Sequence, residues 1–355
     1  MEEKDEYFES YDNLEVHRLM LSDSPRTEAY RDAIVKNKDY FQGKVVMDVG
    51  AGSGILSLFS WKAGAKKVYA IEASPLAKTL QDIVKTNNAE EVIEVIHKKV
   101  EDVELTEKVD IIISEWMGFY LVHESMLDSV IFARDKFLTE DGIMMPSNAK
   151  IYAAPCSLKS LRQSTVGFWS NVYGFNMSPF AKEALKRTKP EIDIVQPDQI
   201  LSDPVEMLDL NLKYTNSSEL DSVVSKKFVS VKKNDKFQGL ALWFKTDFDN
   251  FLEDDWNQVS LDTSPNALPT HWKQTVVPLF KENSDDEEPV EEDDIIGWEI
   301  SLIRTAKTRQ YALQVEILDP AETEHPEPCE CQSAKCALIA ALMKQEEESI
   351  EMNGV

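Results

Sequence analysis

Two carboxylates flank a short loop of glycine and aromatic residues in the stretch SEWMGFYLVHES, Ser114 to Ser125. The loop follows the apolar run 109–113, which is typical of a buried strand. Glu115 and Glu124 are therefore expected beyond the end of that strand. Two acids held around one loop indicate that something cationic binds there.

A glycine-rich loop supplies a second candidate site. Residues 46–54 read VMDVGAGSG, and they lie between a predicted strand and a predicted helix. Gly50, Gly52 and Gly54 allow the backbone to turn tightly and to approach a ligand closely. Glu72 ends the next predicted strand, and an acid about 20 residues beyond such a loop usually binds ribose hydroxyls. The combination predicts a nucleoside site, and a glycine turn that only packs strand against helix is the alternative.

The spacing of the glycines distinguishes between nucleosides. A dinucleotide fingerprint reads G-x-G-x-x-G, whereas Ile55 occupies the place of its third glycine here. Asp48, inside the loop, would oppose a pyrophosphate but suits a ligand with a positive centre. S-adenosylmethionine carries ribose, adenine, an ammonium and a sulfonium and has no phosphate. We therefore expect Asp48, Gly50, Gly52 and Glu72 to bind S-adenosylmethionine rather than NAD.

The elements that must position these residues follow from the hydrophobic pattern. Between residues 44 and 145, short apolar runs alternate with longer amphipathic ones, which predicts a parallel sheet covered on both faces. After Pro146, shorter β-rich segments predict a second, mostly antiparallel domain. The expected helices cover residues 55–63, 75–87 and 124–138.

One segment inside the β-rich half has a helical rather than a β-strand sequence pattern. Residues 161–189 look helical and amphipathic, and they carry the aromatic cluster FWSNVYGF at 168–175. An exposed aromatic cluster indicates an oligomer contact, and an internal core contact is the alternative.

Composition restricts the partners. Lys and Arg number 38 against 64 Asp and Glu, so the net charge is −26. This charge disfavours nucleic acid and anionic membrane surfaces and attracts basic partners. The first ten residues lack the features of a signal peptide, and no run approaches the roughly 20 apolar residues of a membrane span. An intracellular soluble protein is expected, with residues 283–294, almost all acidic, as a solvated loop.

The C-terminal tail holds most of the cysteines. Cys329, Cys331 and Cys336 follow His325, which raises the possibility of a metal cluster. The spacing C-x-C-x4-C matches no common zinc pattern, so reduced thiols and no metal are expected. One helix-like run covers residues 334–348.

Four separated motifs together resemble the type I protein arginine methyltransferases. They are YFESY at 7–11, VMDVGAGSG, SEWMGFYLVHESM and THW at 270–272. The resemblance runs from Tyr7 to about Asp319. It implies an N-terminal helical lid segment (1–40), a Rossmann-like cofactor domain (41–146), a β-barrel (147–319) with a helical dimerisation arm at about 165–190, and a flexible tail (320–355).

The same resemblance implies an activity and partners. Arginines of basic proteins, such as histones or Arg–Gly-rich proteins, would be converted to monomethyl and asymmetric dimethylarginine by a homodimer that uses S-adenosylmethionine. Membrane and direct nucleic-acid partners are not expected. The form LVHESM, with His123, is similar to the nuclear, histone-modifying branch, so the expected location is the nucleus, the cytoplasm or both.

Roles carry over residue by residue from the family motifs. Glu115 and Glu124 would grip the substrate guanidinium, and His271 with Asp23 would accept the proton, with Glu124 as the alternative acceptor. The remaining cofactor residues implied are His17, Arg26, Val100, Glu101, Met126, Phe8 and Tyr11. The substrate residues implied are Tyr7, Met20, Trp116, Met117 and Trp272. Tyr7, Phe8 and Tyr11 would form a lid over the cofactor.

Two other functions remain open from the sequence. A catalytically silent module could use the acidic surface to capture basic proteins, although none of the core motif residues is missing. An oxidoreductase would be distinguished by whether NAD or S-adenosylmethionine raises the melting temperature.

Overall fold

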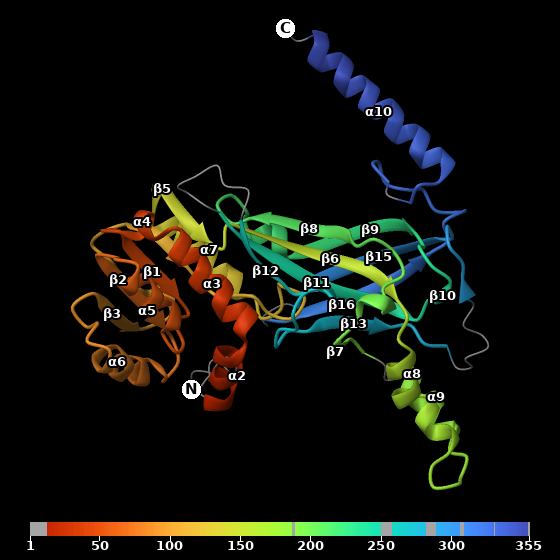
Figure 1. Ribbon diagram of the computed structural model, residues 1–355, viewed down its shortest axis with the longest axis horizontal. Helices are drawn as coiled ribbons and strands as arrows, with labels where there is room; N and C mark the ends of the chain where they lie inside the picture. Colours follow the sequence, from red (N-terminus) through yellow and green to blue (C-terminus); the bar gives the residue numbers. More distant parts are fainter. Residues whose placement is uncertain are drawn as a thin grey trace.

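The computed structural model describes an α/β part and a β-rich part that lie side by side (Figure 1). The residues described are 13–186, 189–249, 258–281, 289–305, 309–329 and 331–353. The two parts share one continuous core, which includes the fully buried Tyr30, Phe41, Phe244, Phe248 and Trp298.

The α/β part is built on a five-stranded parallel sheet in the order β3-β2-β1-β4-β5. Its strands are nearly continuous apolar runs, as expected for strands covered on both faces. Their bounds are β1 Val45–Val49, β2 Lys67–Glu72, β3 Ile93–His97, β4 Val109–Ile113 and β5 Leu138–Met145. The predicted parallel sheet is confirmed.

Helices cover this sheet on opposite faces. The helix α5 (Ile55–Lys62) packs on β1 to β3, and α7 (Met126–Phe137) packs on β1, β4 and β5. The strand order reverses direction between β1 and β4, so right-handed crossovers place these helices on different faces. The carboxyl ends of β1 and β4 therefore form a switch point, where ligands of such sheets bind.

The other helices of this part precede or flank the sheet. They are α2 Leu14–Ser22, α3 Ser24–Lys36, α4 Lys38–Phe41, α6 Ala77–Thr86 and the short turn η1 Val100–Asp102. The helix predicted at 124–138 begins only at Met126, because Glu124 and Ser125 have left-handed backbone with φ of +77° and +51°.

The β-rich part is antiparallel, as predicted. One sheet has the order β7-β13-β11-β6-β8 with β12 on β11, and another has the order β16-β15-β9. A short ribbon pairs β10 with β14. The bounds are β6 Asn148–Cys156, β7 Glu191–Asp193, β8 Val205–Asn211, β9 Ser222–Ser230, β10 Asp235–Lys236, β11 Gly239–Phe248, β12 Val259–Asp262, β13 Gln274–Pro278, β14 Pro289–Val290, β15 Ile295–Arg304 and β16 Tyr311–Leu318, with turns η3 Pro197–Gln199 and η4 Ser217–Leu220.

An arm formed by residues 159–186 projects from the β-rich part, here called the barrel (Figure 1). The single helical segment predicted at 161–189 is wrong in detail, because the chain forms α8 (Lys159–Thr165), a turn η2 (Gly167–Ser170) and α9 (Pro179–Lys186). A tight turn with a bridge between Val172 and Phe175 breaks the helix. The aromatic side chains stay exposed, which argues against the internal core contact: Phe168, Tyr173, Phe175 and Phe180.

Beyond β16 the chain ends in α10 (Ala334–Asn353), which is longer than the run predicted from the sequence and extends away from the barrel (Figure 1). Residues 283–288 of the acidic stretch lie outside the described residues. Among the described helices, none combines the length and the apolar character that a bilayer crossing needs.

Candidate active site

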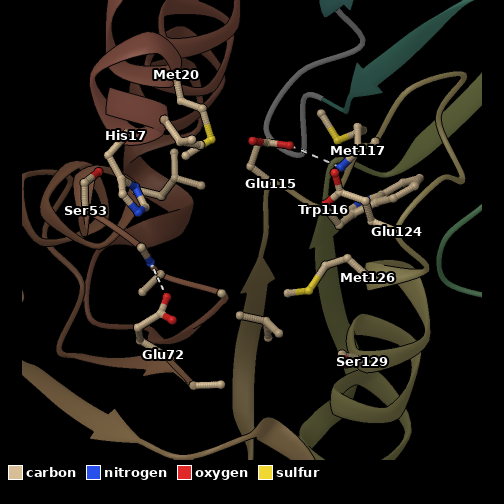
Figure 2. Close-up of a pocket in the computed structure, with 18 of the residues that line it drawn as sticks. His17, Met20, Ser53, Glu72, Glu115, Trp116, Met117, Glu124, Met126 and Ser129 are labelled. Atoms are coloured by element: carbon tan, nitrogen blue, oxygen red, sulfur yellow. Dashed lines mark hydrogen bonds between the residues drawn. The ribbon is translucent and has the colours of Figure 1, made fainter. Parts of the chain in front are cut away.

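A cavity of about 280 Å³ lies at the switch point. It is bounded by the loop after β1, the loop after β4, the end of β2 and the helix α2. Figure 2 shows His17 and Met20 approaching it from one side, Met126 from the other, and Glu72 below. The glycine loop (residues 50–54) and the loop that carries Glu115 and Glu124 (residues 114–125, the acid loop) were predicted separately. Both line this one cavity.

The glycine loop has the backbone that its sequence predicts. Gly50 and Gly52 have φ of +73° and +52°, which favours glycine. A Cβ added at Gly50 would lie 2.6 Å from Cε of Met126. The backbone therefore lines the cavity closely where a ligand must fit between β1 and α7.

Glu72 is held in place by backbone donors. Its Oε2 accepts from the Gly52 amide at 2.7 Å (Figure 2). Its Oε1 accepts from the Ser74 amide at 2.7 Å. The carboxylate is buried at the cavity wall. A carboxylate in a fixed orientation beside a glycine loop suits a pair of ribose hydroxyls.

Asp48 does not line the cavity, which corrects the prediction of direct contact with a cationic ligand. Its Oδ2 accepts from the Ser57 hydroxyl at 2.6 Å, and the side chain is fully buried between β1 and α5. Burial raises the pKa of Asp48 to about 7, although the hydrogen bond from Ser57 opposes this. The carboxyl thus connects β1 to α5, the two elements that flank the glycine loop.

The far end of the cavity is formed by η1 and α7. Val100 and Glu101, two of the cofactor residues implied by the resemblance, line it. Ser129 also lines it and donates to Oε1 of Glu101 at 2.7 Å. The sequence reasoning missed Ser129, although it lies three residues after Met126 and hence on the same face of α7.

Arg26 braces the acid loop. Its Nη2 and Nε both donate to Oε2 of Glu115, at 2.5 and 2.9 Å. Its Nη1 donates to the Met20 carbonyl at 3.2 Å. Burial lowers the pKa of Arg26, but the charge and hydrogen bonds of Glu115 outweigh this and leave it raised. Arg26 lines the cavity as well, and its contact with a ligand carboxylate, implied by the resemblance, stays a prediction.

The helix α3 positions this arginine. Asp23 caps the helix, because its Oδ1 accepts from the Arg26 amide at 3.1 Å. One turn further on, the Tyr30 hydroxyl donates to the Ser114 carbonyl at 2.8 Å. Arg26 and Tyr30 are spaced i, i+4, so one face of α3 holds both ends of the strand-to-loop junction. Tyr30 was missed, and that spacing was its available signal.

The second oxygen of Asp23 binds the Thr–His–Trp loop. Its Oδ2 accepts from the backbone amide of His271 at 2.8 Å and pairs with His271 Nδ1 at 2.6 Å. Burial raises the pKa of Asp23, but the hydrogen bonds from His271 and Arg26 outweigh this and leave it below its ordinary value. The ionised Asp23 therefore draws Nδ1–H toward itself, and in a neutral imidazole this leaves Nε2 as the accepting nitrogen.

Trp272 completes the contact between the barrel and the acid loop. Its indole N–H donates to the Met117 carbonyl at 3.0 Å, while the Met117 amide donates to Oε1 of Glu115 at 3.1 Å. Both oxygens of Glu115 are therefore held by protein donors, Oε2 by two and Oε1 by one, at the lining of the cavity.

Glu124 lies in a strained part of the acid loop. Tyr120, Leu121, Glu124 and Ser125 all have positive φ, between +41° and +77°, which costs of order 1–3 kcal/mol each for residues other than glycine. A Cβ at Gly118 would lie 2.0 Å from the His123 carbonyl oxygen. The close folding of this loop brings Glu124 into the lining of the cavity that Glu115 also lines.

Arg309, missed from the sequence, supports this loop from the barrel. Its Nη1 lies 3.5 Å from the Glu124 carbonyl, and its own carbonyl accepts from the Ser125 hydroxyl at 3.3 Å. No motif marks this position, because the contact joins residues 185 apart.

The other predicted residues divide into two groups. His17, Met20, Trp116, Met117, Met126, His271 and Trp272 all line the cavity. Tyr7, Phe8 and Tyr11, the predicted lid, lie outside the described residues, so this prediction stays open.

Together these features define a class of enzyme. An α/β sheet with a glycine loop and a buried acid forms a nucleoside site, and the adjoining carboxylates form a cation site in the same cavity. The backbone of Gly50 and Gly52 leaves room that side chains would fill, and the acids Glu72 and Glu101 suit hydroxyl and amine groups rather than phosphates. This is the arrangement of a group-transfer enzyme with a phosphate-free nucleoside donor.

Two family models match the chain, one on each part. Residues 147–318 match the arginine methyltransferase oligomerization subdomain, and residues 32–144 match the ribosomal protein L11 methyltransferase (PrmA). The two matches are separated by residues 145–146.

Curated relatives match most of the chain. The probable protein arginine N-methyltransferase 6.1 of Oryza sativa subsp. indica is 42% identical over 294 residues, which cover 76% of this chain and 78% of that protein. The protein arginine N-methyltransferase 6 of Danio rerio is 39% identical over 90% of each chain. The human protein arginine N-methyltransferase 2 is 38% identical over 86% of this chain and 70% of its own.

Solved structures agree with these relatives. The Trypanosoma brucei PRMT1 enzyme–prozyme heterotetrameric complex with AdoHcy superimposes with a TM-score of 0.78 at 34% identity, covering 89% of this chain and 98% of its own. A PRMT6–SAH structure gives 0.73 at 29% identity, covering 86% and 100%.

The chain belongs to the protein arginine N-methyltransferase family. It methylates arginine side chains of proteins, and S-adenosylmethionine is the methyl donor. The Rossmann-like domain, the C-terminal β domain and the protein arginine methyltransferase family expected from the sequence are confirmed.

Proposed function

We propose that the protein is a type I enzyme, which forms monomethylarginine and then asymmetric dimethylarginine on basic proteins such as histones or Arg–Gly-rich proteins. The observation that carries this proposal is the single cavity that joins Glu115 and Glu124 to the glycine loop. The net charge of −26 supports a basic substrate.

The two carboxylates address the poor reactivity of arginine. A guanidinium stays protonated and spreads its charge over three nitrogens. Glu115 and Glu124 bind the donors of its planar fork, hold the charge on one side and direct one terminal nitrogen toward the glycine loop. S-adenosylmethionine supplies an electrophilic methyl group on a sulfonium. Fixed positioning by protein groups then lowers the barrier to transfer.

The substrate nitrogen must lose a proton as it gains the methyl group. His271 lines the cavity, and Asp23 orients it so that Nε2 faces away from the carboxylate with a lone pair. A neutral imidazole in this state accepts a proton at neutral pH. Glu124 is the alternative acceptor, because it lines the same cavity.

The residues around the two carboxylates, Glu115 and Glu124, affect how many methyl groups the product can carry on one nitrogen. Met20 and Met126 line the cavity from α2 and α7. Thioether side chains are unbranched and adaptable, so these walls leave space for a nitrogen that already carries one methyl group. A second transfer to that same nitrogen gives the asymmetric product.

Mass spectrometry of a methylated histone or Arg–Gly-rich peptide tests the proposal. Fragmentation distinguishes asymmetric from symmetric dimethylarginine. We expect monomethyl product early and asymmetric product later. Symmetric dimethylarginine would overturn the type I assignment, and an end product that stays monomethylated at high enzyme concentration would contradict it too.

We also propose a homodimer joined through the arm, in the nucleus or the cytoplasm. The exposed aromatic side chains of the arm support this, with Tyr173 99% and Phe175 68% exposed, since apolar groups gathered on a projecting segment indicate a binding surface. Sedimentation of Phe175→Ser and Phe180→Ser variants tests the interface, with exposed Lys182→Ser on the same arm as the control. Unchanged dimers in both variants would contradict it.

A further inference from the structure

The structure brings together one histidine and three cysteines after β16. The Nδ1 of His325 lies 3.4 Å from Sγ of Cys329, 3.3 Å from Sγ of Cys331 and 3.3 Å from Sγ of Cys336. All four atoms lie within 4.8 Å of one another, and none of the cysteines is in a disulfide. We propose that these residues bind a structural zinc ion that fastens the base of α10 to the barrel.

The distances from the histidine nitrogen to the three sulfurs fit a tetrahedral ion. Zinc–sulfur bonds of about 2.3 Å and zinc–nitrogen bonds of about 2.0–2.1 Å place a nitrogen and a sulfur ligand about 3.6 Å apart at tetrahedral angles. The three nitrogen–sulfur distances here are within a few tenths of an ångström of that value. A Cys₃His set is moreover a usual one for closed structural zinc sites.

His325 is oriented as a metal ligand. Its other ring nitrogen, Nε2, lies 3.0 Å from the Pro320 carbonyl oxygen. A carbonyl oxygen only accepts, so Nε2 carries the hydrogen and Nδ1 directs its lone pair toward the sulfurs. A backbone carbonyl on the non-ligating nitrogen is the usual outer contact of a zinc-bound histidine.

The cluster is joined to the barrel. The ring of Phe228, on β9, stacks on the His325 ring with centroids 3.8 Å apart and planes 10° apart. Cys331 and Cys336 are buried against Phe228, together with Ile295 of β15. The ligands are therefore held by packing as well as by the turn of the chain.

The position of the site explains what it would do. Cys336 lies in the first turn of α10, whereas the other ligands precede the helix. An ion bound by all four residues would connect that first turn to the end of the barrel away from the α/β part (Figure 1). With four protein ligands, the site keeps no open position for a substrate, so its role is structural.

Binding would also change the charge. Zinc takes the place of three thiol protons, which are released, so Zn²⁺ with three thiolates and a neutral imidazole carries a net charge of −1. No electron transfer is involved. The soft thiolates favour zinc over the harder cations magnesium and calcium.

The spacing C-x-C-x4-C matched no common zinc pattern, and for that reason the sequence favoured free thiols. The sequence pattern does not show the four residues together, because the histidine precedes the cysteines and the chain packs against Phe228 of β9. The structure thus supplies the arrangement that the spacing concealed.

The test uses the full chain, purified under reducing conditions without a chelator. We expect about one zinc ion per chain by elemental analysis. After removal of the metal, Co²⁺ titration should give the intense absorption of a tetrahedral cobalt–thiolate site, and zinc should displace it. Metal removal should also lower the melting temperature.

Variants locate the site. Cys331→Ser, Cys336→Ser and His325→Phe, which keeps a ring on Phe228, should each weaken zinc binding more than about tenfold. Cys156→Ser is the matched control, because Cys156 is the remaining cysteine, is buried in the barrel and contacts the Gly239 carbonyl instead. It should keep the metal.

The proposal fails if the wild-type chain holds no zinc and the metal-free chain shows no cobalt–thiolate absorption. It also fails if the chain holds iron instead, or if Cys156→Ser loses the metal while the ligand variants keep it. Because the cobalt titration uses the wild-type chain, poor folding of a variant does not affect it, and AdoHcy affinity serves as an independent check on the distant cavity.

Discussion

Arg26 and Glu115 are 89 residues apart in the sequence, yet two nitrogens of one donate to a single carboxylate oxygen of the other. Their side chains are only 9% and 11% exposed. A buried pair of this geometry connects α3 to the acid loop, so a residue of α3 that lines the cavity also orients the carboxylate of Glu115, for which we propose substrate binding. Breaking such a pair leaves a buried charge unpaired.

Arg26→Lys should lower both the affinity for AdoHcy and the rate of methyl transfer, because a single ammonium cannot reproduce the guanidinium fork. We expect a fall in kcat/KM of about tenfold to a hundredfold. Arg31→Lys is the control, since Arg31 lies on the same helix but pairs with exposed Asp32 at the surface. Equal behaviour of the two variants would show that the buried pair does not position the loop.

Asp23→Asn separates the two roles of this residue. An asparagine still caps α3, so the melting temperature should change little. It lacks the charge that holds the His271 tautomer, so if His271 accepts the proton, kcat should fall by about a hundredfold, within the usual range of general base effects. Steady-state kinetics with an AdoHcy binding control measures this. A normal kcat would leave Glu124 as the acceptor.

Gly50→Ala should weaken AdoHcy binding measured by calorimetry, because its Cβ would lie 2.6 Å from Cε of Met126 at the cavity wall. Gly43→Ala is a matched control for backbone strain, since Gly43 has φ of +75° against +73° and its Cβ would meet open space. Both variants should lose similar stability, and only Gly50→Ala should lose affinity. A similar loss of affinity in both would contradict the close fit.

The raised pKa of Asp48 implies that the stability of the protein depends on pH. Its pKa is about 7 in the folded chain and near 3.8 in the unfolded one, so the folded state holds the extra proton between these values. The contribution of this group to the free energy of unfolding therefore falls as the pH rises from about 4 to 7 and is level above that. Asp48→Asn removes this loss and keeps an acceptor for Ser57.

Chemical denaturation of the ligand-free protein at several pH values measures the difference. The gain in stability of Asp48→Asn over wild type should grow from pH 4 to 7 and exceed about 1 kcal/mol at pH 8. Asp39→Asn, at an exposed position on α4, is the control. Parallel stability curves for wild type and Asp48→Asn would contradict the raised pKa.

The sequence predicted the parts of the structure that depend on local pattern. Continuous apolar runs such as 109–113 indicate a buried parallel strand because both faces of the sheet are covered. The positions of Gly50, Gly52 and Glu72 followed from the chemistry of nucleoside loops. Glu115 and Glu124 were expected together from their place beyond a strand, and both line the cavity. The family motifs added His271 and Asp23, which form a hydrogen-bonded pair.

The parts that were missed depend on contacts between distant residues. Tyr30 and Arg309 support the acid loop from α3 and from the barrel, and neither carries a motif. Asp48 was placed in the cavity because the loop pattern does not show on which side of β1 a side chain lies. The arm was drawn as one helix because amphipathic spacing does not show the tight turn at Val172–Phe175.

The central claim is that two carboxylates together hold the substrate guanidinium next to the cofactor loop. Single-turnover methyl transfer by Glu115→Gln and Glu124→Gln, with AdoHcy affinity measured on the same samples, tests it most directly. Glutamine keeps the size but not the charge, so transfer should fall by about a thousandfold or more in each variant, while Glu124→Gln keeps wild-type AdoHcy affinity. Transfer within about tenfold of wild type in either variant would contradict the account.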